Sequence, residues 1–199
     1  METKLKLIEL LEQKQIERGI HLRELSRLLK TGLPNVVRYV KLLEKEGVVE
    51  SRKEVNTIKV KIKEGIRTIA YLKQVNTERF LNLPKKIQIA VNDFLNELEI
   101  KPVLGLIFGS YSKKTYNENS DIDILLVYQK VEDEKRIENT AKRISSRTNT
   151  KISPVYLDYK SFENNFLDKK DDFSREIRNN VIILTGTEIY YALLWRFLE

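Results

Sequence analysis

Two short motifs in the second half of the chain carry residue types that can act on phosphate groups. Gly109 and Ser110 directly follow the apolar run 103–108, and ten residues separate Ser110 from the next polar cluster, Asp121-Ile122-Asp123. Glycine lets the backbone approach a phosphate closely, and the serine hydroxyl and neighbouring backbone N–H groups can donate hydrogen bonds to phosphate oxygens. The pattern therefore predicts a phosphate cradle at Gly109 and Ser110.

The paired aspartates stand at the start of a second apolar run, 124–128. Residues two apart in a strand point to the same face, so Asp121 and Asp123 should present their carboxylates side by side. Two like charges at this spacing repel each other, and a hard divalent cation is the usual remedy. A phosphate cradle beside paired carboxylates indicates metal-assisted phosphoryl or nucleotidyl transfer, with Asp121 and Asp123 as catalytic and metal-binding residues.

The segment that holds both motifs, IFGSYSKKTYNENSDIDILLVY (residues 107–128), resembles the nucleotidyltransferase domain of the DNA polymerase beta superfamily. It is most similar to the small prokaryotic minimal nucleotidyltransferases, and a weaker resemblance extends over residues 84–186. The resemblance implies that Gly109, Ser110 and Lys113 hold the triphosphate of an NTP, with ATP expected, and that Asp121 and Asp123 hold two Mg²⁺ ions.

The chain departs from this family at the third carboxylate. Active members place it on the next strand, here predicted at residues 151–157, where it shares a metal and helps deprotonate the attacking hydroxyl. The aligned position is Ser153, whereas Asp158 and Glu163 follow further along the chain. Relatives also often carry glycine where this chain has Lys114. The resemblance therefore implies nucleotide and Mg²⁺ binding and leaves turnover open.

The first third of the chain has a different pattern. Apolar stripes predict helices at residues 4–17, 21–30 and 34–47, followed by strands at 48–53 and 57–62. This order resembles the winged helix-turn-helix domain of prokaryotic regulators, with LRELSRLLKTGLPNVVRYVKLLEKEGVVESRK (residues 22–53) as the matching run. Residues 1–65 carry 15 basic and 10 acidic side chains, which favours a polyanionic partner.

In such a domain the third helix lies in the major groove of duplex DNA and the wing contacts phosphates. Asparagine and arginine suit base edges because each can make two hydrogen bonds to one base. The candidate DNA-binding residues are Asn35, Val37, Arg38 and Lys41 on the helix, and Arg52 and Lys53 on the wing. The alternative is a winged helix that binds protein, because Glu44 and Glu46 near the end of the helix would oppose a phosphate backbone.

Composition excludes several other kinds of protein. The 199 residues include no cysteine, so disulfide frameworks, cysteine–zinc sites and thiol nucleophiles are excluded, and the single histidine, His21, excludes a two-histidine metal site within one chain. No apolar run approaches the roughly 20 residues of a membrane span, and no signal-peptide core is evident. We therefore expect a cytoplasmic protein that does not associate with membranes.

These observations predict an α+β protein: a winged helix-turn-helix domain at residues 1–65, a helical connector at 66–83, and a nucleotidyltransferase-like domain with a mixed sheet and flanking helices at 84–199. The leading hypothesis is a DNA-binding protein that transfers a nucleoside monophosphate from an NTP to an unknown hydroxyl acceptor. The alternative is a transcriptional regulator, or an antitoxin-like protein with a HEPN-domain partner, whose nucleotidyltransferase fold is catalytically impaired. A second copy of the chain is a further candidate partner.

Overall fold

The computed structural model describes residues 2–15, 19–54 and 56–199, and the chain forms two compact units, Met1–Val75 and Asn76–Glu199. The end of the first expected helix, residues 16–17, and Val55 between the two expected strands lie outside the described residues. The division between the units falls inside helix α4 (Ile66–Leu81), in the stretch that the sequence suggested as a connector.

The first unit contains three further helices and a small antiparallel sheet of order β1-β3-β2. Its elements are α1 (Thr3–Gln15), β1 (Ile20–His21), α2 (Leu22–Leu28), α3 (Leu33–Lys45), β2 (Val49–Glu54) and β3 (Thr57–Ile62). Strand β1 was not expected, because two residues cannot show an alternation of apolar and polar side chains. Its backbone nevertheless pairs with β3, with Ile20 opposite Val60.

Helix α3 follows from the pattern of its sequence. Proline is tolerated in the first turn, where its missing N–H would have no helical partner, and Pro34 lies there. Val36, Val40 and Leu43 are buried and lie along one face. The helix ends before Gly47, whose φ of 74° is the left-handed conformation that glycine adopts most readily.

The second unit has a mixed sheet, as expected, with four strands in the order β6-β5-β4-β7. Strands β5 and β6 are parallel, whereas β4 is antiparallel to both β5 and β7. Strand β6 lies at one edge, and its Pro154 is opposite Ile124 of β5. The elements are α5 (Lys85–Glu97), β4 (Leu104–Ile107), α6 (Gly109–Lys113), β5 (Ile122–Tyr128), α7 (Glu134–Thr148), β6 (Ile152–Asp158), α8 (Tyr159–Leu167), α9 (Asp172–Asn179), β7 (Ile182–Thr185) and α10 (Thr187–Leu198).

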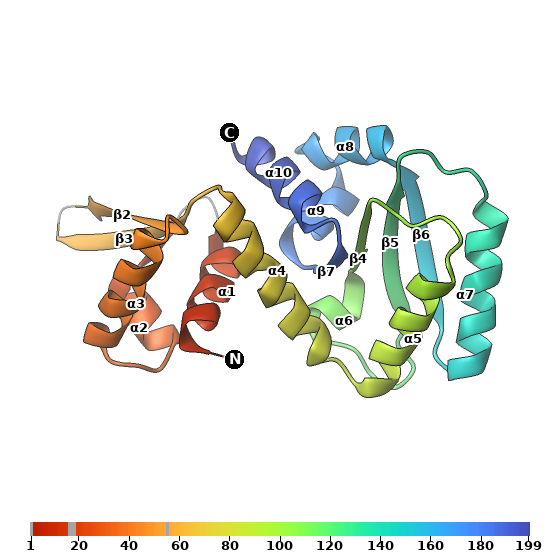
Figure 1. Cartoon of the computed structure of the whole chain (residues 1–199), viewed down its shortest axis with the longest axis horizontal. Helices are drawn as coiled ribbons and strands as arrows, with labels where there is room; N and C mark the ends of the chain where they lie inside the picture. The colour runs from red at the N-terminus through yellow and green to blue at the C-terminus, as the bar shows by residue number, and fades with distance from the viewer. Residues whose placement is uncertain (1, 16–18, 55) are drawn as a thin grey trace. The chain divides into compact units, whose positions relative to one another are not determined.

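Helices cover both faces of the central strand β5. Ile122, Ile124 and Leu126 belong to the cluster of buried residues that β5 forms with helices α5 and α7, which lie together beside the sheet in Figure 1. The alternate residues Leu125 and Val127 are also fully buried, and helix α8 packs against β5 and β6. A strand buried on both faces is held rigidly, which fixes the positions of the polar residues at its start.

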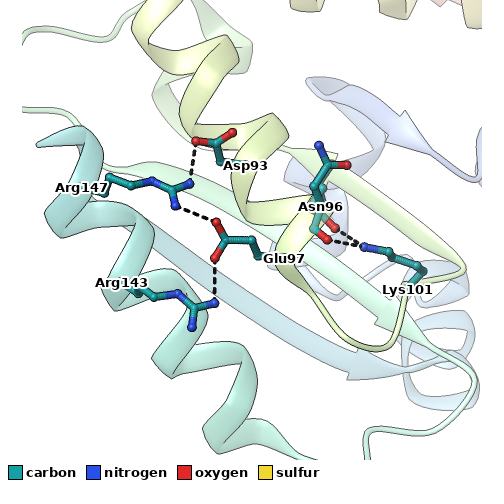
Figure 2. A network of polar contacts seen from close by, with 7 residues as sticks. Asp93, Asn96, Glu97, Lys101, Arg143 and Arg147 are labelled. Atoms are coloured by element: carbon teal, nitrogen blue, oxygen red, sulfur yellow. Dashed lines mark hydrogen bonds and ion pairs between the residues drawn. The ribbon is translucent and has the colours of Figure 1, made fainter.

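A polar network joins helices α5 and α7 on the surface (Figure 2). Arg147 contacts Asp93 at 2.7 Å and Glu97 at 2.8 Å, and Arg143 contacts Glu97 at 2.7 Å. Lys101 donates to two backbone carbonyls at the end of α5. Because both arginines are at least half exposed, these ion pairs fix the register of the two helices more than they stabilise the unit.

The aromatic stripe of helix α10 packs on its own unit. Tyr190, Tyr191 and Leu194 are buried, and the Tyr190 hydroxyl donates to the carbonyl of Ile177 at 2.9 Å. The stripe is therefore part of a core. Among the described residues, no helix combines the length and apolar character of a bilayer-crossing segment.

Candidate nucleotide and metal site

The two sequence motifs meet where strands β4 and β5 run side by side. The chain leaves β4 at Phe108, whose backbone N–H donates to the carbonyl of Asp123 at 3.0 Å. Gly109 then begins α6 with a φ of 67°, and a Cβ placed on it would lie 2.2 Å from Oδ2 of Asp123. Glycine is thus required both by the backbone conformation and by the carboxylate that packs against it. The ten residues between Ser110 and Asp121 thus connect two motifs that are in direct contact in the fold.

Asp121 is tied to strand β6, the parallel neighbour of β5. Its Oδ2 is ion-paired with Nζ of Lys151 and accepts a hydrogen bond from the Ser153 hydroxyl at 3.2 Å. The Asp121 side chain is one-third exposed, whereas that of Lys151 is 71% exposed. The carboxylate therefore faces solvent at the edge of the site, where a ligand has access to it.

Both acidic and basic side chains lie near the carboxylate of Asp123. Burial first, and then the negative charges of Asp121 and Glu176, raise the pKa of the Asp123 carboxyl, while Lys151 and Lys113 oppose the rise. A bound divalent cation would relieve this repulsion, and carboxylate oxygens are the ligands that Mg²⁺ prefers. Asp121 and Asp123 therefore fit a divalent cation. In the described chain, however, no three acidic or histidine side chains are grouped as metal ligands.

The residues expected to hold phosphate lie around α6. Ser110 is half-buried in its first turn, next to Gly109. Lys113 is ion-paired with Glu176 of α9 at 2.6 Å, so a nucleotide would have to compete with this carboxylate. Lys114 has a φ of 60°, the left-handed conformation that glycine adopts most readily. The lysine is exposed, so its bulk points to solvent and leaves the cradle open.

The position of a third carboxylate is occupied by serine. Register places Ser153 opposite Asp123, whereas Asp158 is opposite Tyr128 at the other end of the strands. Ser153 and Asp158 are five residues apart along the strand, a distance of about 16 Å. Asp158 instead caps α8 by accepting from the backbone N–H of Ser161 at 2.9 Å, and Glu163 is paired with Arg196 at 2.8 Å. Neither acid can replace the missing one.

Two residues of the site were missed from the sequence, Lys151 and Glu176. Lys151 could have been found: once Ser153 is aligned with Asp123 in parallel strands, Lys151 must lie beside Asp121. Glu176 has no such signal, because α9 reaches the site through tertiary packing. Phe173 of α9 packs edge to face against Phe108, with ring centroids 5.4 Å apart.

The first unit exposes most of the candidate DNA-binding residues. Asn35, Arg38 and Lys41 are exposed on α3, and Arg38 lies over the ring of Tyr39 at 5.2 Å. Val37 is half-buried and therefore less available than expected.

On the hairpin of β2 and β3, Arg52 and Lys53 are both exposed. Arg52 lies 3.2 Å from Glu50, which partly neutralises its charge. Glu46 at the end of α3 is 2.7 Å from Lys4 and accepts a hydrogen bond from the Tyr71 hydroxyl at 2.7 Å. These two donors hold the pKa of Glu46 below its usual value. Its negative charge is therefore balanced within the unit.

Comparisons with known proteins found a matching family model, a similar curated protein and a similar solved structure, and the family match lies in the second unit. Residues 90–184 match the family model of the polymerase beta nucleotidyltransferase domain. A candidate protein adenylyltransferase of Methanocaldococcus jannaschii is 28% identical over 75 residues, which are 36% of this chain and 75% of that protein. A solved toxin–antitoxin structure with AMP-PNP has a TM-score of 0.42 and 20% identity over 55% of this chain and 82% of that one. Residues 90–184 of the second unit are therefore similar to the nucleotidyltransferase domain of polymerase beta.

Proposed function

We propose that the protein transfers an adenylyl group from ATP to a hydroxyl group of another protein. The observation that carries this proposal is the contact between Gly109 and the carboxylate of Asp123, with Asp121 beside it. It brings the candidate phosphate-binding turn at the start of α6 against the candidate cation ligands at the start of β5. The adenylyl group and the protein acceptor are supported by the similarity to the candidate adenylyltransferase.

In this proposal the residues of the chain bind and orient ATP. The backbone N–H groups at Gly109 and Ser110 and the Ser110 hydroxyl donate to the triphosphate. Asp121 and Asp123 hold Mg²⁺, which offsets negative charge on the phosphates and on the attacking oxygen. The acceptor hydroxyl attacks the α-phosphate, the bond to the β-phosphate breaks, and pyrophosphate and a proton are released.

ATP labelled on the α-phosphate tests the transfer in a cell extract that supplies acceptors. Protein-bound label beyond that of the extract alone should appear with the wild-type chain and not with the Asp121→Asn/Asp123→Asn variant. ATP labelled on the γ-phosphate should give no label that depends on the added chain, because protein kinases of the extract account for the rest. Asp158→Asn is the matched control, because Asp158 lies at the far end of β6 and asparagine also caps helices. A HEPN-domain protein is the acceptor to add first.

The alternative function is a nucleotide-binding module without turnover, and serine at position 153 favours it. General-base help is typically worth about 10²–10⁴ in rate, so its loss could leave binding without detectable transfer. Nucleotide binding that depends on Asp121 and Asp123 but yields no labelled protein would favour this alternative. A chain that binds no nucleotide would contradict both.

For the first unit we infer winged-helix binding to duplex DNA. It is supported by the exposed Arg38 and Lys41, neither of which has an ion pair among the described residues, and by the pairing of Glu46 with Lys4. The two units together would make a regulator that carries nucleotidyltransferase chemistry. Binding to a random-sequence pool, followed by sequencing of the retained DNA, tests this function, and retention of no DNA would favour a protein-binding role.

A further inference from the structure

Strand β6 brings two side chains to the aspartate pair, and the parallel register decides which two. The backbone N–H of Ile122 donates to the carbonyl of Lys151 at 2.8 Å, and Asp123 is opposite Ser153. Neighbouring residues of paired strands share a face. Lys151 and Ser153 therefore lie on the same face as Asp121 and Asp123.

Both side chains act on one carboxylate oxygen. Oδ2 of Asp121 is ion-paired with Lys151 and accepts the hydrogen bond from Ser153, which leaves Oδ1 for another ligand. Glu176 is the other acid near Asp123, and it is paired with Lys113. The cations nearest to the site are thus lysine ammonium groups that the fold itself supplies.

The charge of the site differs from that of a site with three carboxylates. Such a site offers a charge of −3, whereas Asp121, Asp123 and Lys151 together offer −1. Two divalent cations about 4 Å apart repel each other strongly and need anionic ligands between and around them. The side chains of this site thus offer two negative charges fewer than a three-carboxylate site with which to hold two such ions, and no third acidic ligand is grouped with the pair among the described residues.

We propose that this site binds one divalent cation, held by Asp121 and Asp123, and that the ammonium group of Lys151 supplies the positive charge that a second ion would bring. Lys151 is then a positioning residue that holds Oδ2 of Asp121, and Ser153 supports it through the shared oxygen. This inference rests on the proposed function and assigns one ion to the site, where the resemblance to the nucleotidyltransferases implied two.

Counting Mn²⁺ ions tests the inference without measuring transfer. The chain is dialysed to equilibrium against Mn²⁺ and α,β-methylene-ATP, which cannot donate an adenylyl group, and free Mn²⁺ is measured by paramagnetic resonance. One ion per chain is expected. Two ions would overturn the inference and leave the proposed function standing, whereas no bound ion would overturn both.

Two variants then test the roles of Lys151 and Ser153. The Lys151→Gln/Ser153→Asp variant gives the site a charge of −3, and it should bind two Mn²⁺ ions per chain. A count that stays at one would overturn the inference.

A second variant, Lys151→Gln alone, is measured without nucleotide, because Pro154 next to Ser153 can hinder folding of the first variant. Its affinity for Mn²⁺ should rise about two- to fivefold, which corresponds to the interaction free energy of an exposed ion pair. Lys130→Gln, at the opposite end of β5, is the matched control and should leave the Mn²⁺ affinity and the number of bound ions unchanged. If the Mn²⁺ affinity rises equally in both single variants, or rises in neither, the role of Lys151 is overturned.

Discussion

Replacing Gly109 with alanine should separate the stability of the second unit from its ability to bind a cation. Alanine in a left-handed conformation costs about 1–2 kcal/mol, and the lower entropy of the unfolded chain offsets about 0.4–1 kcal/mol of this. The net backbone cost is therefore about 1 kcal/mol. In addition, the new Cβ would lie 2.2 Å from Oδ2 of Asp123, where ordinary contact begins at 3.4 Å.

The carboxylate must therefore move by about 1 Å, the difference between these two distances. Displacing a group that aligns a metal ligand commonly lowers affinity about 10- to 100-fold, and we expect a loss of this size for Mn²⁺. Urea unfolding followed by the fluorescence of the only tryptophan, Trp195, reports the stability of the second unit. Calorimetry with Mn²⁺ and a non-transferable ATP analogue reports the site.

Gly47→Ala is the control for this experiment. Gly47 has a φ of 74° but no atom within 4 Å of the position of its added Cβ. The substitution should therefore destabilise the first unit by about 1 kcal/mol and leave Mn²⁺ affinity unchanged. A Gly109→Ala variant that binds Mn²⁺ as tightly as the wild type would refute the argument that this glycine positions Asp123.

Three further predictions follow from contacts in both units. Glu46→Gln should destabilise the first unit by about 1 kcal/mol at pH 7, measured by urea unfolding with circular dichroism, because Lys4 loses an ionised partner. The pKa of Glu46 is lowered by folding, so its contribution is complete above the ordinary glutamate value and is lost as the pH falls through the folded pKa; variant and wild type should converge in acid. Asp158→Ala should cost about 1 kcal/mol through loss of the α8 cap while Mn²⁺ binding persists, and weaker binding would place Asp158 in the site. Arg38→Ala should weaken DNA binding, measured by fluorescence anisotropy. If Arg38 contacts a phosphate, the slope of log K against log salt should fall by about 0.9, and if it contacts a base, the preference for that base should relax. No change in affinity, slope or base preference would argue against α3 as the DNA-binding helix.

The central part of the fold was predictable because its signals are local. Gly109 and the Asp121/Asp123 pair mark a turn and a strand start, and the apolar runs beside them must be buried strands. What could not be predicted depends on partners distant in sequence. Strand β1 exists only because Ile20 pairs with Val60, forty residues away, and Glu176 reaches the site only because α9 packs on Phe108. Ser153 lies between these cases, since its place opposite Asp123 follows from strand register once the strands are assigned.

The edge strand β6 constrains how another protein can bind to the second unit. Because the Ile122 N–H bonds to the Lys151 carbonyl, the alternation of backbone groups directs residue 153 toward β5 and residue 154 toward the open edge. Residue 154 is proline, which has no N–H to donate at the open edge. An additional strand that paired with β6 would therefore lack one hydrogen bond and would contact the pyrrolidine ring of Pro154. Sheet extension along this edge is therefore disfavoured, which protects the unit from edge-to-edge aggregation. In the proposed transfer, an acceptor protein that approaches from the β6 side would be recognised through side chains and would bring its hydroxyl past Lys151.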